Sequence, residues 1–286
     1  MKEQKMRKKA AVKFRAFDLC AALILTGAGV VFLLPFIWMV IVSFERYANI
    51  QPPFPPRFTL ETPSLFNYRI AVENGRLLRA YGNSFFVALL SVSFCLASSL
   101  LGGYALSKGI FRGKKAVMLL ILSTMMIPFE TRMIPMFLMF NRARLANTFW
   151  PLILPSVLDA FNLLLAKNYF DTLPDSLAES AEIDGAGRFR VFLRIFVPLT
   201  GPIAATIIIL KFLGSWNAFL WPLVVLTGER MRTIPLYMAI FADDSNRFYG
   251  TTLAVAVLGV LPVLAVFLLM QKYIIRSVAL SGLKGE

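Results

Sequence analysis

The chain has 286 residues, of which 58% are hydrophobic and 16% charged, a composition too apolar for an ordinary soluble domain. It contains no histidine, which excludes histidine-dependent catalysis and Cys/His metal sites, so no catalytic or metal-binding residues are expected. The formal net charge of +14 would suggest nucleic acid in a soluble protein, but here Lys and Arg flank apolar runs and orient them in a bilayer. We therefore expect membrane lipid, and no nucleic acid, among the partners.

Six apolar segments are long enough to cross a bilayer, because a helix that rises about 1.5 Å per residue needs roughly 20 residues to cross about 30 Å. The expected spans are about 19–44, 80–107, 116–140, 149–168, 199–227 and 248–270. The third is interrupted by "IPFETRMIP" at 127–135, while the fourth and fifth carry one charge each, Asp159 and Lys211. The sequence thus predicts an all-α membrane protein with six transmembrane helices.

Basic residues set the expected orientation. The head "MKEQKMRKKAAVKFR" and the connection "KGIFRGKK" at 108–115 are both rich in Lys and Arg, which places both in the cytoplasm. Arg142 and Arg144, in a short outside loop, run against this bias. The expected organisation is a basic cytoplasmic tail at 1–18, a first span at 19–44 that is an uncleaved anchor, an extracytoplasmic loop at 45–79, a core at 80–272 and a cytoplasmic tail at 273–286.

A charged, glycine-broken stretch, "LAESAEIDGAG" at 177–187, lies between the fourth and fifth spans. Ser176 and Glu179 have the spacing of a capping box, and Gly185 can adopt a positive φ and end the helix. The residues alone leave open an ordinary amphipathic connector at the membrane surface.

The same stretch carries a resemblance to a known family. Glu179-Ser180-Ala181-x-x-Asp184-Gly185-Ala186, followed by Phe192, Ile195, Pro198-Leu199 and Pro202, resembles the EAA motif of permease subunits of binding-protein-dependent ABC importers. Ser180 departs from the usual alanine but is also small. The resemblance covers nearly the whole chain and is strongest to the maltose-type carbohydrate branch, in "YGNSFFVALLS" (81–91), "GGYALSKGIFRGKK" (102–115), "WNAFLWPL" (216–223) and "QKYIIRSVALSGLKG" (271–285).

The resemblance implies the transmembrane domain of a type I ABC importer in a bacterial plasma membrane. Its coupling helix, at about 176–187, would dock on a cytoplasmic ATPase through Glu179, Ser180, Ala181, Asp184, Gly185 and Ala186. The implied partners are a second homologous permease, an ATPase dimer that binds ATP and Mg, and an extracytoplasmic solute-binding protein. The chain has no phosphate-binding loop of its own, so it is not expected to bind a cofactor or hydrolyse ATP. The tail would reach the ATPases; the alternative is a disordered end.

The substrate implied by the branch is a carbohydrate, and an oligosaccharide in particular. Sugars are bound by hydrogen-bonding groups and aromatic rings. Charges at mid-bilayer usually face protein or a water-filled cavity, and broken helices tend to line cavities. The candidate substrate path is Asn162, Trp216, Asn217, Trp221, Glu130, Asp159 and Lys211.

Each of these candidates has another interpretation. Asp159 and Lys211 would pair with each other or line the path, or else Lys211 would snorkel to the interface. Glu130 would lie at the external headgroups if the third span ended near Pro128. The tryptophans would anchor the chain at the interfaces.

Three other functions are alternatives for this sequence. The first is the same kind of permease for a different solute. The second is a self-sufficient ion-coupled carrier, which predicts inverted repeats, and none stands out. The third is an intramembrane enzyme, which would need a paired set of catalytic side chains, and none appears at helix-face spacing. Co-purification with an ATPase distinguishes the importer subunit from the last two.

Overall fold

The computed structural model describes residues 2–50, 55–73, 75–183, 185–244 and 248–282. One residue of the motif, Asp184, lies outside them. Within these ranges the chain is helical and no β-strand occurs apart from an isolated bridge between Glu45 and Pro63. The chain divides into two compact units, Met1–Glu73 with Asp244–Val257, and Asn74–Asp243 with Leu258–Glu286. They are described separately.

The first unit contains α1 (Lys2–Ser43), α2 (Phe66–Glu73) and the beginning of α14 (Tyr249–Gly282). The backbone of α1 is helical through the segment expected to be a tail, and α2 lies within the expected loop at 45–79. A buried amide holds this unit together: Asn67 Nδ2 donates to the carbonyl oxygens of Ser43 at 3.1 Å and Glu45 at 2.8 Å. The side-chain oxygen Oδ1 of Asn67 accepts from Asn49 Nδ2 at 2.8 Å. Buried polar groups are therefore paired across the loop that follows α1.

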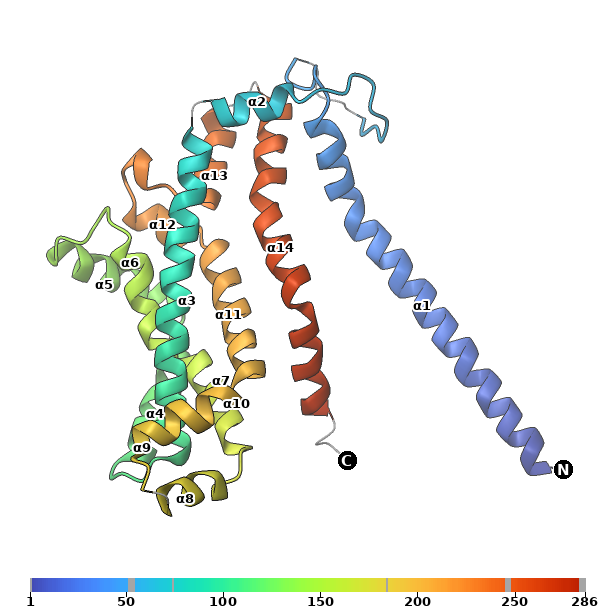
Figure 1. The fold of residues 1–286 in the computed structure, drawn as a ribbon. Coiled ribbons are helices and arrows are strands. Elements are labelled where there is room, and N and C mark those ends of the chain that lie inside the picture. Colours follow the sequence, from blue (N-terminus) through green and yellow to red (C-terminus); the bar gives the residue numbers. More distant parts are fainter. Residues whose placement is uncertain (1, 51–54, 74, 184, 245–247, 283–286) are drawn as a thin grey trace. The chain divides into compact units, whose positions relative to one another are not determined.

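The second unit is built around the long helix α3 (Arg76–Lys108), with α7 (Ala160–Asp171) and α11 (Gly201–Trp216) packed against it (Figure 1). The other elements before α11 are α4 (Lys114–Met125), α5 (Phe129–Arg142), α6 (Trp150–Ile153), η1 (Leu154–Leu158), α8 (Ser176–Ile183), α9 (Arg188–Val191), η2 (Phe192–Phe196) and α10 (Val197–Leu199). Those after α11 are α12 (Leu220–Val225), η3 (Glu229–Met231), α13 (Ile234–Asp244) and the rest of α14.

The contact between α3 and α7 is close because α3 has glycine where the helices meet. A Cβ atom added to Gly103 would lie 2.8 Å from both the Cβ of Ala166 and the backbone nitrogen of Lys167. Small residues at such contacts let transmembrane helices approach closely enough for van der Waals packing, which supplies much of their association energy in lipid. Gly103 is thus a packing requirement of the fold.

Among the residues that the structure describes, four helices are long and apolar enough to cross a membrane: Leu19–Ser43, Arg76–Lys108, Trp150–Asp171 and Tyr249–Leu269. Two bent pairs raise the number to six if each pair is one span, namely Lys114–Met125 with Phe129–Arg142, bent by 101°, and Arg188–Leu199 with Gly201–Trp216, bent by 78°. An all-α fold with up to six spans agrees with the sequence.

The structure agrees with the expected break in the third span and with the expected bounds of the last span, and it differs in the fifth. The segment at 116–140 is interrupted as the sequence predicts, because Pro128 disfavours helical geometry at the preceding residue and lacks the N–H needed to continue α4. The segment at 199–227 is interrupted after Trp216, and Pro222 within α12 cannot donate a hydrogen bond back toward α11. The last span, Tyr249–Leu269, agrees with the expected 248–270, and the helical backbone of α14 continues to Gly282, through part of the expected tail.

One apolar cluster occupies the end of the second unit at which α3 ends. Its buried members come from α3, α7, α9, η2 and α11: Cys95, Leu100, Ala166, Phe170, Val191, Phe192, Phe196, Ile203 and Ile207. The half-buried ring of Tyr104 packs against it, 5.0 Å from each of the rings of Phe192 and Phe196, a distance typical of favourable aromatic pairs. We call this set the inner cluster. It is the surface on which the charged connector rests.

Candidate functional site

The connector between α7 and α9 is a short helix, α8, at the end of the second unit where α3 ends and α4 begins (Figure 1). Ala178 and Ala181 are half-buried and pack against the inner cluster, as does Ala186 just after the helix. Glu179 and Ser180 are exposed, and Ile183 keeps 86% of its surface exposed. The helix therefore has an alanine face toward its own chain and an outer face that carries an acid and a large apolar side chain.

Gly185 ends α8 as the sequence predicts. Its φ is +79°, its N–H donates to the Glu182 carbonyl at 3.0 Å, and the next N–H, of Ala186, donates to the Ala181 carbonyl at 2.9 Å. This pair of hydrogen bonds is the Schellman arrangement, and the left-handed position in it favours glycine. Its two chain neighbours aside, no heavy atom of the described residues lies within 4 Å of a Cβ built on Gly185, so glycine is required there for backbone conformation rather than for space.

The start of α8 differs from the expected capping box. Ser176 is the first residue of the helix rather than its N-cap, and the Glu179 N–H donates to the Asp175 carbonyl at 3.1 Å. The Asp175 carboxylate instead pairs with Lys108 Nζ at 2.5 Å, and the same ammonium donates to the Leu173 carbonyl at 2.6 Å. The last turn of α3 is thereby tied to the start of α8, so the basic 108–115 connection and the acidic connector lie at the same end of this unit.

A bent path leads from α8 to α11. After α9 the backbone forms a π-helical turn, η2, and α10 then meets α11 at the 78° bend. Phe196, within η2, is fully buried in the inner cluster, and Tyr169 on α7 donates its hydroxyl to the Leu199 carbonyl at 2.7 Å. π-Helical turns are frequent at functional sites. Buried side chains lie on both sides of the bend, Phe196 before it and Ile203 after it, so packing against the inner cluster holds the segment that connects α8 to α11.

The two charges inside the expected fourth and fifth spans meet. Lys211 Nζ on α11 donates to Asp159 Oδ2 at 3.1 Å, and Asp159 Oδ1 also accepts from the Asn162 N–H at 3.1 Å as the N-cap of α7. The predicted pairing is confirmed. Both side chains are largely buried, and an ion pair keeps either charge from facing a low-dielectric surrounding alone.

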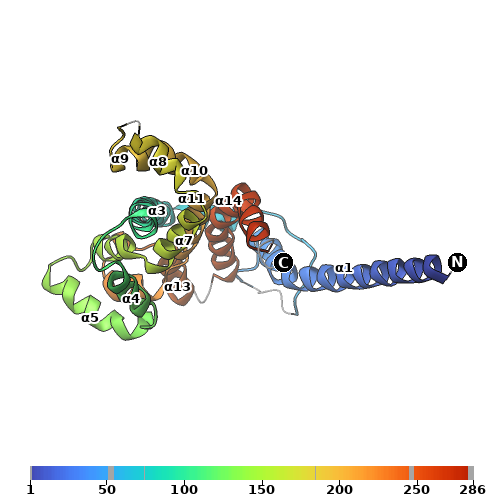
Figure 2. The same cartoon turned by 90° about the horizontal axis from the view of Figure 1, so that it is seen from below.

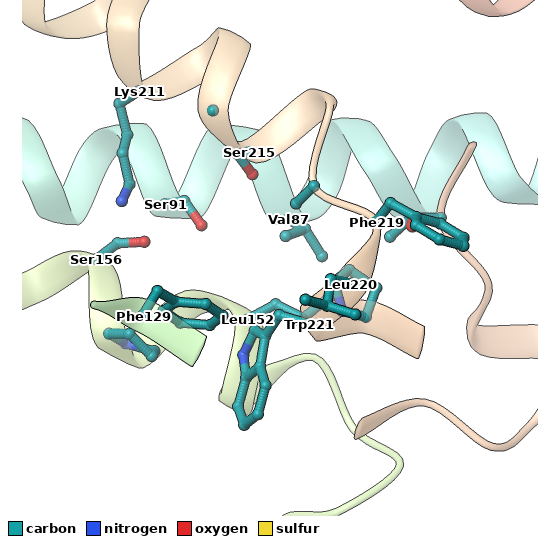
Figure 3. Close-up of a pocket in the computed structure, with 15 residues that line it drawn as sticks. Val87, Ser91, Phe129, Leu152, Ser156, Lys211, Ser215, Phe219, Leu220 and Trp221 are labelled. Atoms are coloured by element: carbon teal, nitrogen blue, oxygen red, sulfur yellow. The ribbon is translucent and has the colours of Figure 1, made fainter. Parts of the chain in front are cut away.

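A pocket of about 320 Å³ opens beside Lys211 (Figure 3). Its wall carries the hydroxyls of Ser91, Ser156, Ser215 and Thr233 together with the rings of Phe129, Phe219 and Trp221. Within the described residues, the buried hydroxyl oxygens of Ser91 and Thr233 have no hydrogen-bonding partner. Buried hydroxyls normally have partners, so these two retain unused hydrogen-bonding capacity in the wall of the pocket.

The predicted path residues do not all reach this pocket. Lys211 and Trp221 line it, and Trp221 Nε1 donates to the Pro151 carbonyl at 2.8 Å. Trp216 is a core residue, only 2% exposed and stacked on Phe212 at 5.5 Å. The four others, which are absent from the lining, are Asp159, the buried Asn162, and the exposed Asn217 and Glu130.

Sequence reasoning missed the four hydroxyl residues, because Ser and Thr scarcely interrupt an apolar run and so give little signal in hydropathy. Among the described residues, no group of three or more His, Cys, Asp or Glu side chains could hold a metal ion.

Up to six apolar spans among the described residues, a capped connector at one end and a pocket lined by hydroxyls and aromatic rings are features of a multi-pass membrane protein of the transport class. Residues 98–280 match the family described as the binding-protein-dependent transport system inner membrane component. The chain belongs to this family, since the match covers more than half of its length and full-length relatives agree.

The chain is 35% identical over 229 residues to the arabinooligosaccharides transport system permease protein AraQ of Halalkalibacterium halodurans, covering 80% of this chain and 82% of that protein. It is 30% identical over 273 residues to the trehalose/maltose transport system permease protein MalG of Thermococcus litoralis, covering 92% and 97% respectively. A chain in the crystal structure of a bacterial ABC transporter involved in the import of the acidic polysaccharide alginate has a similar fold. The TM-score is 0.80 at 26% sequence identity, over 91% of this chain and 96% of that chain.

Proposed function

We propose that the chain is one permease subunit of an ATP-driven importer that moves a carbohydrate, in particular an oligosaccharide, across the bacterial plasma membrane. A second homologous permease would complete the pathway, and an extracytoplasmic binding protein would deliver the solute. A cytoplasmic ATPase dimer would bind ATP and Mg. Both termini would then be cytoplasmic, with the segment at 45–79 outside. Family membership and the transport systems named for the relatives support this assignment.

The observation that carries the proposal is the division of α8 into two faces. Its alanine face is anchored to the inner cluster, while Glu179, Ser180 and Ile183 face away from the rest of the chain. An exposed isoleucine beside an acid is suited to a partner's groove, because the apolar side chain loses its water on docking and the acid fixes orientation. We infer that Glu179, Ser180, Ala181, Gly185 and Ala186 form the ATPase-docking segment. Asp184, outside the described residues, remains part of this prediction.

The anchoring of α8 suggests how nucleotide-driven movement would reach the pathway. A displacement of α8 by the ATPase would press on the inner cluster, whose members include Phe192 and Phe196 on the bent segment. Closely packed interiors transmit displacement rather than absorb it. The bend would then reorient α11, which carries Lys211 and Ser215 on the wall of the pocket. Alternating access would follow from the same movement in the second permease.

The pocket has the chemistry that a sugar requires. Hydroxyls can both donate and accept hydrogen bonds, as Ser91, Ser156, Ser215 and Thr233 would toward sugar hydroxyls, and the rings of Phe129 and Trp221 offer apolar faces. The Lys211 charge is offset by Asp159, so the wall favours a neutral polyol over an ion. The proposed substrate path therefore contains Lys211, Trp221 and the four hydroxyl residues, whereas Trp216 is a packing residue.

The test is affinity purification of the tagged full chain in mild detergent, followed by measurement of ATP hydrolysis by the recovered complex. We expect an ATPase and a second permease to co-purify, and candidate oligosaccharides with their binding protein to stimulate hydrolysis. Glu179→Arg should lower ATPase recovery, while Glu229→Arg, a matched reversal at an exposed site away from α8, should not. Recovery of the chain without any ATPase, together with uptake driven by an ion gradient in vesicles, would instead identify a self-sufficient carrier.

A further inference from the structure

A second pocket, of about 760 Å³, lies in the second unit between the end of α3, the start of α4 and the end of α7. Figure 2 shows these three helices next to one another. Leu106, Phe111, Met118 and Leu119 form its apolar wall, and Lys114, Lys115, Lys167 and Asp171 form its polar wall. It shares no lining residue with the pocket beside Lys211.

This pocket lies where candidate spans end. One span ends at Lys108, another ends at Asp171, and the first half of a bent pair begins at Lys114. The ends of transmembrane helices lie near the level at which hydrocarbon gives way to lipid headgroups. The helix α4 has no buried residue, and Leu119 keeps 67% of its surface exposed. The apolar wall therefore continues along a helix that this chain leaves uncovered.

The charge of the pocket is positive, because three lysines and one aspartate line it. Lys167 pairs with Asp171 at 2.6 Å, so these two charges offset each other. Lys114 Nζ donates to the Ser107 and Gly109 carbonyls at 2.9 and 3.0 Å, which leaves one of the three ammonium N–H groups for another acceptor. Lys115 is exposed and adds a further positive charge.

The start of α4 reinforces this potential. Gly113, with φ +84°, precedes the helix and lines the pocket. The first hydrogen bond of α4 runs from the Val117 N–H to the Gly113 carbonyl at 3.0 Å, so the N–H groups of residues 114–116 lie ahead of the helical ladder. Free N–H groups and the positive end of a helix dipole favour a phosphate at this position.

We propose that this pocket binds the headgroup of an anionic glycerophospholipid. Lys114, Lys115 and the start of α4 hold the phosphate, and the acyl chains lie along Met118 and Leu119. A soluble anion would leave the apolar wall in contact with water, whereas a lipid covers it, and this difference favours the lipid. The same Lys114 ammonium donates to the carbonyls of Ser107 and Gly109, on either side of Lys108. The Lys108 ammonium in turn pairs with Asp175 and so ties α3 to α8. A bound lipid thus stabilises the connection on which α8 rests.

The experiment is a lipid titration of the purified full chain in detergent, with bound phospholipid counted by native mass spectrometry. The probes are phosphatidylglycerol, phosphatidylcholine with the same acyl chains, and inorganic phosphate as a competitor. We expect phosphatidylglycerol to bind more tightly than phosphatidylcholine, and inorganic phosphate at millimolar concentration to displace neither. No ATPase or sugar is present, so the result is independent of the proposed transport function.

Two variants locate the site. Lys115→Gln should weaken phosphatidylglycerol binding about fivefold, the effect typical of one cation near an anionic lipid surface. Arg112→Gln removes the same charge from an exposed residue of the same loop that does not line the pocket, and should change binding by about twofold or less. Melting temperatures of both variants check folding. Equal losses in the two variants, equal binding of phosphatidylcholine, or displacement by inorganic phosphate would each overturn the proposal.

Discussion

Lys211 and Asp159 join α11 to the beginning of α7 through a contact of 3.1 Å, although each sits within an apolar segment. The carboxylate performs two tasks, because it also caps α7 by accepting from the Asn162 N–H. The pair is 18% and 21% exposed, and Lys211 lines the pocket that we assign to the substrate. The charge of Asp159 can be removed while the cap of α7 is kept, so the ion pair and the cap can be tested separately.

Lys211→Met should destabilise the protein markedly, because it leaves the Asp159 carboxylate without its counter-charge. Removing one partner of a buried pair costs roughly 3–5 kcal/mol, and we expect the lower end here because both side chains keep some contact with solvent. Adding Asp159→Asn should restore most of the loss, since Asn removes the second charge and still caps α7. Thermal unfolding in detergent measures both effects.

The control for this pair is Lys167→Met, which breaks an i,i+4 pair with Asp171 at the end of α7. Pairs of this kind contribute about 0.3–0.5 kcal/mol, so its melting temperature should change little. A double variant no more stable than Lys211→Met alone would show that the two residues do not stabilise the fold as a pair.

Gly185→Val should disrupt the end of α8 without affecting membrane insertion. A β-branched residue at φ +79° is strained by more than the roughly 1–2 kcal/mol that a left-handed conformation costs an ordinary residue. Gly185→Asn should be milder, because Asn tolerates this conformation. Gly187→Val is the matched control, since Gly187 has φ −67° and no atom within 4 Å of an added Cβ.

The measurement for the Gly185 series is the amount of ATPase recovered with the tagged chain, alongside its own expression level. We expect recovery to fall in the order wild type, Gly185→Asn, Gly185→Val, with Gly187→Val close to wild type. Full recovery with Gly185→Val would contradict the docking role of α8, whereas poor expression of all three variants would point to a folding requirement instead.

The end of α8 was predictable because a positive φ strongly favours glycine. Gly185, followed by Ala186, could therefore be recognised from the neighbouring residues alone. The burial of Trp216 was not predictable, because the run from 199 to 227 is apolar around most of the helix and its few polar residues do not show which face is buried. The helix α13 was not predicted, because its 11 residues are too few to cross a membrane. The bend at Pro128 shows that local backbone chemistry overrides hydropathy where a proline interrupts a span.

Three glycines on α3 should respond differently to alanine. Gly103→Ala places a Cβ 2.8 Å from backbone and side-chain atoms of α7, and overpacking of this kind typically costs about 1–3 kcal/mol. At Gly102 the nearest atom is the flexible end of Leu163, which can turn away, so the change should be nearly neutral. Gly82→Ala meets no atom within 4 Å and should stabilise the helix by about 1 kcal/mol through propensity.

Melting temperatures of the three alanine variants in detergent should therefore rank Gly82→Ala above Gly102→Ala and Gly103→Ala lowest. All three variants make the same chemical change on the same helix, so differences among them report the contact with α7. If Gly103→Ala melted at the same temperature as Gly82→Ala, the close approach of α3 and α7 would not be a packing requirement.

Glu45, in the loop after α1, should make the first unit sensitive to acid. Burial raises the pKa of this carboxyl, but hydrogen bonds from the Thr62 hydroxyl and from the N–H groups of Thr62 and Glu61 outweigh it, so the pKa lies below its ordinary value of 4.5. A carboxyl whose pKa is lowered by folding adds stability above its unfolded pKa. That contribution is lost as the pH falls from about 4.5 through the lower, folded pKa.

Wild type should therefore melt above Glu45→Gln at pH 7, and this difference should shrink below pH about 4.5. Glu61→Gln removes the same charge from a side chain in an exposed pair with Arg57, so its difference from wild type should stay small at every pH. A Glu45→Gln difference that did not change with pH would show that the ionised carboxylate does not hold this loop.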